Sequence, residues 1–184
     1  LPSILSDHAI LQRSPETTLW GWADAGEKIT VRFSGIAGET ITTADGIWQI
    51  ALDLSKAPAG SSSLTITGAT TTRTLEDILI GELWLSSGQS NMQFTLNATD
   101  GGWEEIERST NPSLRWFIVD EPGGKFLGKQ DDVRGQWIIA GDEKTGDGSG
   151  VAYYFGKQLQ KNLGVPVGLI MTAIGGSTIQ SWMS

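Results

Sequence analysis

Ser90 stands in a short polar segment whose side chains could support nucleophilic chemistry. The segment reads Gly88-Gln89-Ser90-Asn91-Met92 and follows an apolar run from Ile78 to Leu85. Such a run is typical of a strand that is covered on both faces of a sheet. In open α/β sheets, ligands bind beyond the carboxyl ends of the strands. A serine hydroxyl placed there can attack a carbonyl carbon if a neighbouring base accepts its proton.

Residue types alone leave two interpretations of this serine open. Ser and Asn at a turn between a strand and a helix are usually helix caps. Alternatively, free N–H groups at the start of the following helix would orient the Ser90 hydroxyl and stabilise a developing oxyanion. The lipase-type motif G-x-S-x-G is not met, because Met92 stands where the second glycine belongs.

The sequence offers few partners for such a serine. It contains one histidine, His8, and no cysteine. Within these residues, a His-rich metal site, thiolate chemistry and disulfide bonds are therefore excluded. A hydrolase triad would have His8 as its only candidate base. His8 lies far from Ser90 in sequence, and we predict that it is a surface histidine without a chemical role.

The composition argues against several kinds of partner. The chain has 13 Lys and Arg and 21 Asp and Glu, which give a net charge of −8 at pH 7. Nucleic acid and anionic membrane surfaces would be repelled and are not expected partners. No apolar stretch reaches the roughly 20 residues that span a bilayer. The N-terminus shows no signal-peptide pattern, so we expect a mature chain that is secreted, periplasmic or lysosomal.

Residues 1–76 have the pattern of a small β domain. Short runs at 19–22, 29–33, 47–52 and 63–67 alternate apolar with polar or small residues, and turn residues separate them. This spacing predicts an antiparallel, sandwich-like domain. We expect Trp20, Trp22 and Trp48 to fill its core, although a sugar-stacking face would use the same residue type.

Residues 77–184 have the pattern of an α/β domain. Apolar runs at 78–85, 114–119 and 165–174 predict buried strands. Ser149 can cap a helix that ends at Gly164, with an apolar stripe of Val151, Phe155, Leu159 and Leu163 and with Tyr154 on the same side. A strand, a helix and a strand with short connections favour a parallel sheet. This half looks incomplete, because it contains only about three strands and one convincing helix, and open sheets usually have more strands.

Other segments are weaker candidates for a site. Residues 123–129 have the spacing of a phosphate-binding loop, but Gln130 replaces the required Ser or Thr, and we predict a surface loop. Residues 142–150 are polar and rich in Gly, which favours a mobile loop. Asp142, Glu143 and Asp147 lack the spacing of a calcium loop, so no metal site is expected there.

Several blocks of the sequence, in order, resemble the sialate O-acetylesterase family, a branch of the SGNH (GDSL-like) hydrolases. The nucleophile block of that family is similar to residues 84–92, Trp-Leu-Ser-Ser-Gly-Gln-Ser-Asn-Met. Further blocks resemble its opening strands and its later segments, and they comprise residues 1–7, 11–13, 20–23, 151–156, 165–170 and 175–178. The resemblance covers nearly the whole chain. It implies an SGNH-type three-layer parallel-sheet hydrolase domain, incomplete over 77–184 and preceded by the β domain.

The resemblance also implies roles for individual residues. Ser90 would be the acyl-accepting nucleophile. Its backbone N–H and that of Gly175 or Gly176 would line the oxyanion hole, with help from the amide of Gln89 or Asn91. The chemistry agrees, because glycines let the backbone approach a substrate closely. No metal or cofactor is implied. The Asp-x-x-His block of the family is absent from these residues, so a second chain or a further C-terminal segment is expected to supply Asp and His.

The function implied is a serine esterase that removes O-acetyl groups from sugars, with O-acetylated sialic acids as the expected substrates. An esterase for acetylated plant polysaccharides such as xylan is one alternative. A non-catalytic carbohydrate-binding fragment, which lacks the Asp and His pair, is another. We also expect bulky side chains near Ser90 to restrict the acyl pocket to about a methyl group. These side chains are Met92, Phe94, Ile174 and Trp182, and Trp103 could add to the walls of the pocket.

Overall fold

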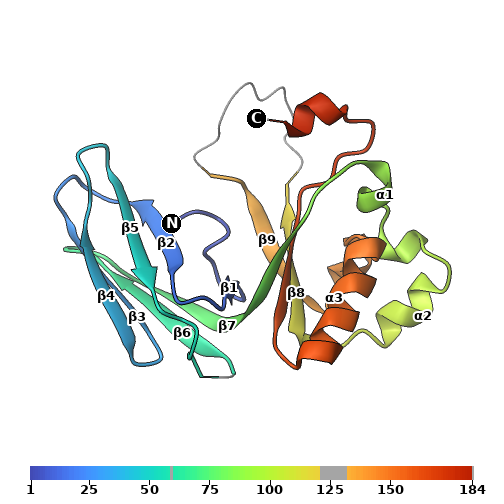
Figure 1. Ribbon diagram of the computed structural model, residues 1–184, viewed down its shortest axis with the longest axis horizontal. Coiled ribbons are helices and arrows are strands. Elements are labelled where there is room, and N and C mark those ends of the chain that lie inside the picture. The colour runs from blue at the N-terminus through green and yellow to red at the C-terminus, as the bar shows by residue number, and fades with distance from the viewer. Residues whose placement is uncertain (59, 121–131, 184) are drawn as a thin grey trace.

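The computed structural model describes residues 1–58, 60–120 and 132–183, and it arranges them in two parts (Figure 1). A β-rich part lies at the left of the view, and a part with strands and helices lies at the right. The loop predicted at 123–129 lies outside the described residues. Strand β7 (Thr72–Ser86) runs from one part into the other.

The β-rich part is built from antiparallel strands, as the alternating pattern predicted. β2 (Thr17–Trp22) pairs with β5 (Ile47–Leu52) in a two-stranded sheet. β4 (Ile36–Ile41), β3 (Lys28–Phe33) and β6 (Ser62–Thr67) pair in that order and continue into β7. Along β3 the side chains alternate between buried and less buried positions, because successive residues of a strand point to opposite faces.

β7 belongs to both parts of the fold. Its first residues pair with β6 as far as Ile78. Beyond that point it pairs in parallel with β1 (Ile10–Gln12) and then with β10 (Val167–Met171). The eight-stranded sheet is therefore continuous across the position where the sequence changes its pattern. The division into domains at 76 and 77 stays a prediction.

The second part contains a mixed sheet rather than a purely parallel one. β7, β10 and β8 (Asn111–Val119) are parallel, as the alternation of strand and helix predicted. β9 (Gly135–Ala140) was not predicted, and it is antiparallel to β8 at the edge of the sheet. The architecture is thus a mixed α/β fold.

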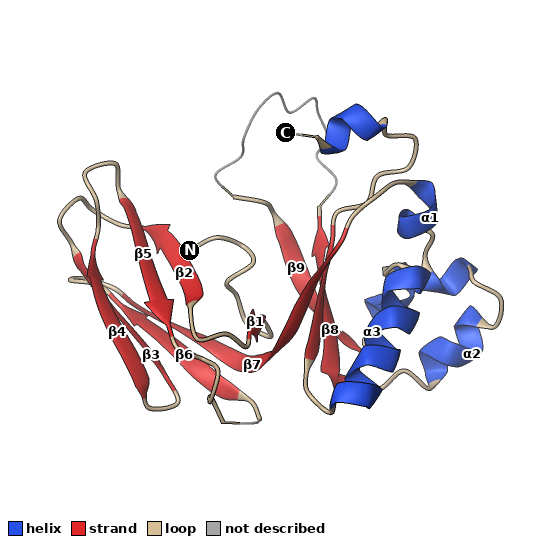
Figure 2. Cartoon of the chain, in the orientation of Figure 1, coloured by secondary structure: helices blue, strands red, loops and turns tan. Residues whose placement is uncertain are grey.

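The helices lie together on one side of this sheet (Figure 2). They are α1 (Ser90–Gln93), α2 (Gly102–Glu107) and α3 (Gly150–Leu163), with the 3₁₀ turns η1 (Leu96–Ala98) and η2 (Glu143–Asp147). A further 3₁₀ turn, η3 (Ile179–Trp182), lies apart from them near the C-terminus. The prediction of a mobile loop at 142–150 is wrong at its centre. Thr145 in η2 is fully buried, and its hydroxyl oxygen accepts the N–H of Gly141 at 2.9 Å.

The ends of α3 agree with the sequence, but its buried face does not. Ser149 caps the helix by accepting the N–H of Ala152 at 3.1 Å, and Gly164 ends it in the left-handed conformation. The buried side chains are small or aromatic, namely Ala152 and Tyr153 with Gly150 and Gly156. Of the predicted stripe, Val151, Phe155 and Leu163 are exposed, as is Tyr154, whereas Leu159 is half-buried and packs against the core. The reason is close packing, since a Cβ at Gly156 would lie 2.8 Å from Leu169 and 2.9 Å from Leu114.

Candidate functional site

Ser90 lies at the first position of α1, a few residues beyond the carboxyl end of β7. Its side chain is exposed. Met92 and Gln93 donate their N–H groups to the carbonyl of Gln89, both at 2.9 Å, and so close the turn. Within residues 1–58, 60–120 and 132–183, the N–H groups of Ser90 and Asn91 have no hydrogen-bond partner. Two donors therefore remain available beside the hydroxyl.

Gly175 lies against Ser90 because β7 and β10 stay side by side past their ends. Thr172 donates its N–H to the Ser86 carbonyl at 3.1 Å, and Ile174 donates to the Gly88 carbonyl at 3.0 Å. The same register brings Gly175 opposite Ser90. A Cβ at Gly175 would lie 3.7 Å from both Cα and Cβ of Ser90. The structure thus brings two of the predicted site residues together, although they are distant in sequence.

The side chains on either side of Ser90 hold the glycine loop. The N–H of Gly175 donates to Oε1 of Gln93 at 2.6 Å. Nε2 of Gln89 donates to the Ser177 carbonyl at 3.4 Å. Gly176 adopts a positive φ of 75°, and in the described part of the chain its N–H has no partner. Sequence reasoning missed Gln93. The signal was its position one helical turn after the serine, on the same side of α1.

The side chains that were predicted to wall the acyl pocket do not all lie beside Ser90. Phe94, Ile174 and Trp182 are exposed. Trp182 is held in place, because its Nε1–H donates to the Ser177 hydroxyl at 2.9 Å. Met92 does not face the site as expected. It packs against the core beneath α3, with its sulfur 3.5 Å from the Ser149 hydroxyl. Trp103 lies on α2 and is exposed.

His8 lies at the junction of the two parts and not near Ser90. Its Nδ1 is 2.8 Å from Oδ2 of Asp77, near the start of β7. Strands rise about 3.3 Å per residue, so β7 alone separates Asp77 from Ser86 by roughly 30 Å. His8 is exposed, as predicted. The geometry leaves it unable to serve Ser90 as a base.

Asp77 is the centre of a polar cluster at this junction. It pairs with the buried guanidinium of Arg115 at 3.0 Å, and that guanidinium also donates to the backbone carbonyls of His8, Asp77 and Pro112. Burial alone would raise the pKa of Asp77, but hydrogen bonds from His8, Ser61 and Arg115 outweigh it and lower the pKa. The cluster ties the N-terminal segment to β7 and β8.

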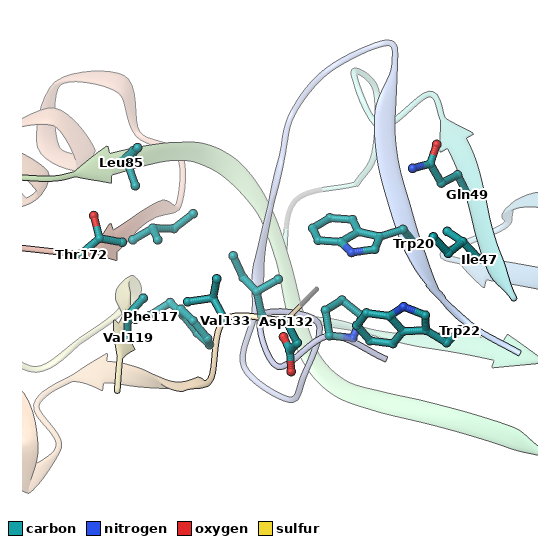
Figure 3. Close-up of a pocket in the computed structure, with 13 residues that line it drawn as sticks. Trp20, Trp22, Ile47, Gln49, Leu85, Phe117, Val119, Asp132, Val133 and Thr172 are labelled. Carbon is teal, nitrogen blue, oxygen red and sulfur yellow. The ribbon is translucent and has the colours of Figure 1, made fainter. Parts of the chain in front are cut away.

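A groove of about 490 Å³ separates the two parts of the fold (Figure 3). Trp20, Trp22 and Gln49 line one wall, and Leu85 and Thr172 line the other. The expectation that three tryptophans fill the sandwich is correct for Trp48, which is buried, and wrong for Trp22, which is exposed. Trp20 is half-buried and lines the groove. Leu85 and Thr172 come from the segments that lead to Ser90 and Gly175, so the groove reaches the same end of the sheet.

Among the described residues, no group of three or more His, Asp and Glu side chains could hold a metal ion. None of the helices in the described ranges is long and apolar enough to cross a membrane.

Comparison with known proteins places the chain in a family. The family model for the sialic acid-specific acetylesterases, which are carbohydrate esterases, matches residues 80–184. The chain belongs to this family. The matched segment includes Ser90, both glycines of the loop and Gln93. The resemblance carried by the serine block is therefore confirmed.

Members and structures similar to this chain cover it from end to end. It is 31% identical to the sialate O-acetylesterase of Rattus norvegicus and 29% identical to that of Homo sapiens, over 99% of its length in each case. A crystal structure of a carbohydrate acetylesterase from Xanthomonas citri matches all of it with a TM-score of 0.93 and 32% identity. The chain spans 37% and 38% of those two relatives and 42% of the Xanthomonas chain.

Proposed function

We propose that Ser90 is the nucleophile of a serine esterase that removes acetyl groups from sugars, with O-acetylated sialic acids as the substrates. The observation that carries this proposal is the contact between Ser90 and Gly175 at the carboxyl end of the sheet. An exposed hydroxyl lies there beside N–H groups that have no partner in the described part of the chain. The names of the relatives supply the substrate class.

The proposed reaction has two halves. The Ser90 oxygen attacks the acetyl carbonyl, its proton passes to a base, and the carbonyl oxygen becomes an oxyanion that the backbone N–H groups of Ser90 and the glycine loop stabilise. The sugar hydroxyl then leaves with that proton. Water attacks the acetyl-serine in the same way and releases acetate. This chemistry calls for no cofactor.

In this proposal, the His that acts as the base and the Asp that orients it come from residues outside these 184. His8 is held by Asp77 at the junction and is roughly 30 Å away along β7. A His and an Asp from a further segment or a second chain would complete the triad. Trp84 of β7 and Phe155 of α3 are exposed and contact each other edge to face, and they offer that segment an apolar surface to pack against. In this proposal, residues 77–184 are part of an SGNH-type hydrolase domain, residues 1–76 form the separate β domain, and the protein acts outside the cytoplasm.

The Ser90→Ala variant tests the nucleophile in the competent protein, meaning these residues together with the segment that carries the base. We expect kcat on an aryl acetate to fall by at least about 10³-fold, because the variant cannot form the acyl-enzyme. The circular dichroism spectrum stays unchanged. Ser87→Ala is the matched control, since Ser87 is exposed in the same segment and has no assigned role. A kcat for Ser90→Ala within about tenfold of wild type would contradict the assignment.

The groove favours carbohydrate binding as a second candidate function. Trp20 and Trp22 present aromatic surface there, of the kind on which sugar rings stack. If binding were the whole function, the competent protein would retain a glycan and hydrolyse no ester.

Comparing hydrolysis of O-acetylated sialic acid and acetylated xylan in the same assay separates the two esterase alternatives.

A further inference from the structure

We propose that Gln93 is a positioning residue of this site, and that its amide oxygen fixes the Gly175-Gly176 turn beside Ser90. The inference rests on the proposed function and concerns how the oxyanion hole is built. Its starting point is the hydrogen bond from the Gly175 N–H to Oε1 of Gln93, at 2.6 Å. Gly175 is one of the residues that the family resemblance nominates as an oxyanion donor.

The contact means that the Gly175 N–H is already used. A backbone amide has one hydrogen, and a short, direct bond to Gln93 leaves none for a substrate oxygen. Gln93 is half-buried, and its backbone N–H is committed to the first turn of α1. Its side chain therefore joins the helix that carries Ser90 to the loop that carries the glycines. The donors left for the oxyanion are the N–H groups of Ser90, Asn91 and Gly176.

Gln93 also comes close to the position that a side chain at 175 would occupy. A Cβ at Gly175 would lie 2.7 Å from Oε1 of Gln93. The next nearest atoms are Cα and Cβ of Ser90, both at 3.7 Å, which is ordinary van der Waals distance. Gly175 does not have a positive φ, in contrast to Gly176. A side chain at 175 would therefore displace the Gln93 amide from its present position, whereas the backbone conformation does not itself call for glycine.

The weaker contact of Gln89 supports the same assignment. Its Nε2 reaches the Ser177 carbonyl at 3.4 Å, near the limit for a hydrogen bond. The Ser177 hydroxyl donates to the Ile174 carbonyl at 2.7 Å and accepts the Trp182 indole N–H. These two bonds lie within the loop. The short hydrogen bond that ties the loop to α1 is the one from the Gly175 N–H to Gln93. A displacement of about 1 Å in such a site can cost on the order of 10²-fold in rate.

A double-mutant cycle on kcat tests the inference in the competent protein. Gln93→Ala removes the acceptor, and we expect kcat to fall by about 10- to 100-fold with KM changed by less than about threefold. Gly175→Ala pushes Gln93 away and should cost a similar factor. Because both act through one contact, the double variant should be no slower than Gln93→Ala. Gln158→Ala is the control, since Gln158 is exposed on α3.

These measurements distinguish a failure of the inference from a failure of the proposed function. If the two losses multiply, Gln93 acts independently of Gly175 and the inference is wrong. It is also wrong if Gln93→Ala leaves kcat within about twofold of wild type while Ser90→Ala abolishes turnover. If Ser90→Ala itself remains active, the proposed function fails, and the inference fails with it. Thermal unfolding of each variant shows whether a loss of rate is a loss of folded protein.

Discussion

At the scale of the residue, the surroundings of Ser90 are more open than the sequence predicted. Met92 packs into the core, and the remaining wall candidates are Phe94, Ile174 and Trp182, whose exposed fractions are 51%, 41% and 38%. Of these three, Trp182 has its ring fixed by a hydrogen bond to the Ser177 hydroxyl. The fixed indole beside the glycine loop is the best candidate for limiting the size of the acyl group.

Replacement of Trp182 should relax acyl selectivity. In the competent protein we expect acetyl esters to exceed butyryl esters of the same alcohol by at least about a hundredfold in kcat/KM, since each excess methylene costs roughly 1–3 kcal/mol. Trp182→Ala should reduce that ratio to about tenfold or less. A series of aryl esters of increasing chain length measures it. Trp103→Ala is the comparison, because Trp103 lies on α2, away from the loop (Figure 1). An unchanged ratio in Trp182→Ala would show that the indole points away from the acyl group.

At the scale of the element, α3 is positioned by its smallest side chains. Gly156 meets Leu114 and Leu169, both of which are buried. The helix thereby comes close to β8 and β10, and Phe155 stays partly exposed, in edge-to-face contact with Trp84 of β7. The distance between helix and sheet matters for the site, because Ser149 at the start of α3 contacts Met92 of α1.

Enlargement of Gly156 should destabilise the fold. Gly156→Val gains a little helix propensity, a few tenths of a kcal/mol. Against this, overpacking of a well-filled core costs about 1–3 kcal/mol, because the leucines must leave their preferred rotamers. We therefore expect the free energy of unfolding in urea to fall by about 1–2 kcal/mol. Gln158→Val, on the exposed face of the same helix, should change it by less than about 0.5 kcal/mol. Equal effects would show that α3 does not pack closely at this position.

At the scale of the whole molecule, the two parts are joined by one strand and one polar cluster. β7 carries the chain from the β-rich part into the second part, and Asp77 binds His8 and Arg115 at the crossing point. Arg115 is 1% exposed, and this carboxylate balances its buried positive charge. Because the cluster also holds backbone carbonyls of the N-terminal segment and β8, its loss should loosen the junction as a unit.

The stability of this junction should depend on pH through Asp77. Its pKa in the folded protein is lowered from the ordinary value of 3.8, so its stabilising effect is complete above that value and is lost as the pH falls through the folded-state pKa. The difference in unfolding free energy between wild type and Asp77→Asn should therefore be largest at neutral pH and shrink below about pH 4. Urea titrations between pH 7 and pH 3 measure it. A difference that is constant over this range would contradict the role of the charge.

The sequence by itself determined the features that depend on neighbouring residues. Alternation along residues 29–33 predicted β3, and Ser149 and Gly164 marked the ends of α3, because strand faces and helix caps are set by a few adjacent side chains. The serine block and the glycine pair could be located in the same way, from their place after apolar runs. The roles assigned to Ser90, Gly175, Gly176, Gln89 and Asn91 stay predictions.

Only the tertiary structure decided which distant groups meet. The apolar stripe of α3 predicted the wrong buried face, because the contact depends on how closely Gly156 can approach two leucines on other strands. His8 lies at the junction because the N-terminal segment pairs with β7 there. The bond between Gln93 and Gly175 joins residues 82 positions apart. Such contacts follow from the register of β7 against β10, and no local pattern carries that register, since it is set by the packing of the whole sheet.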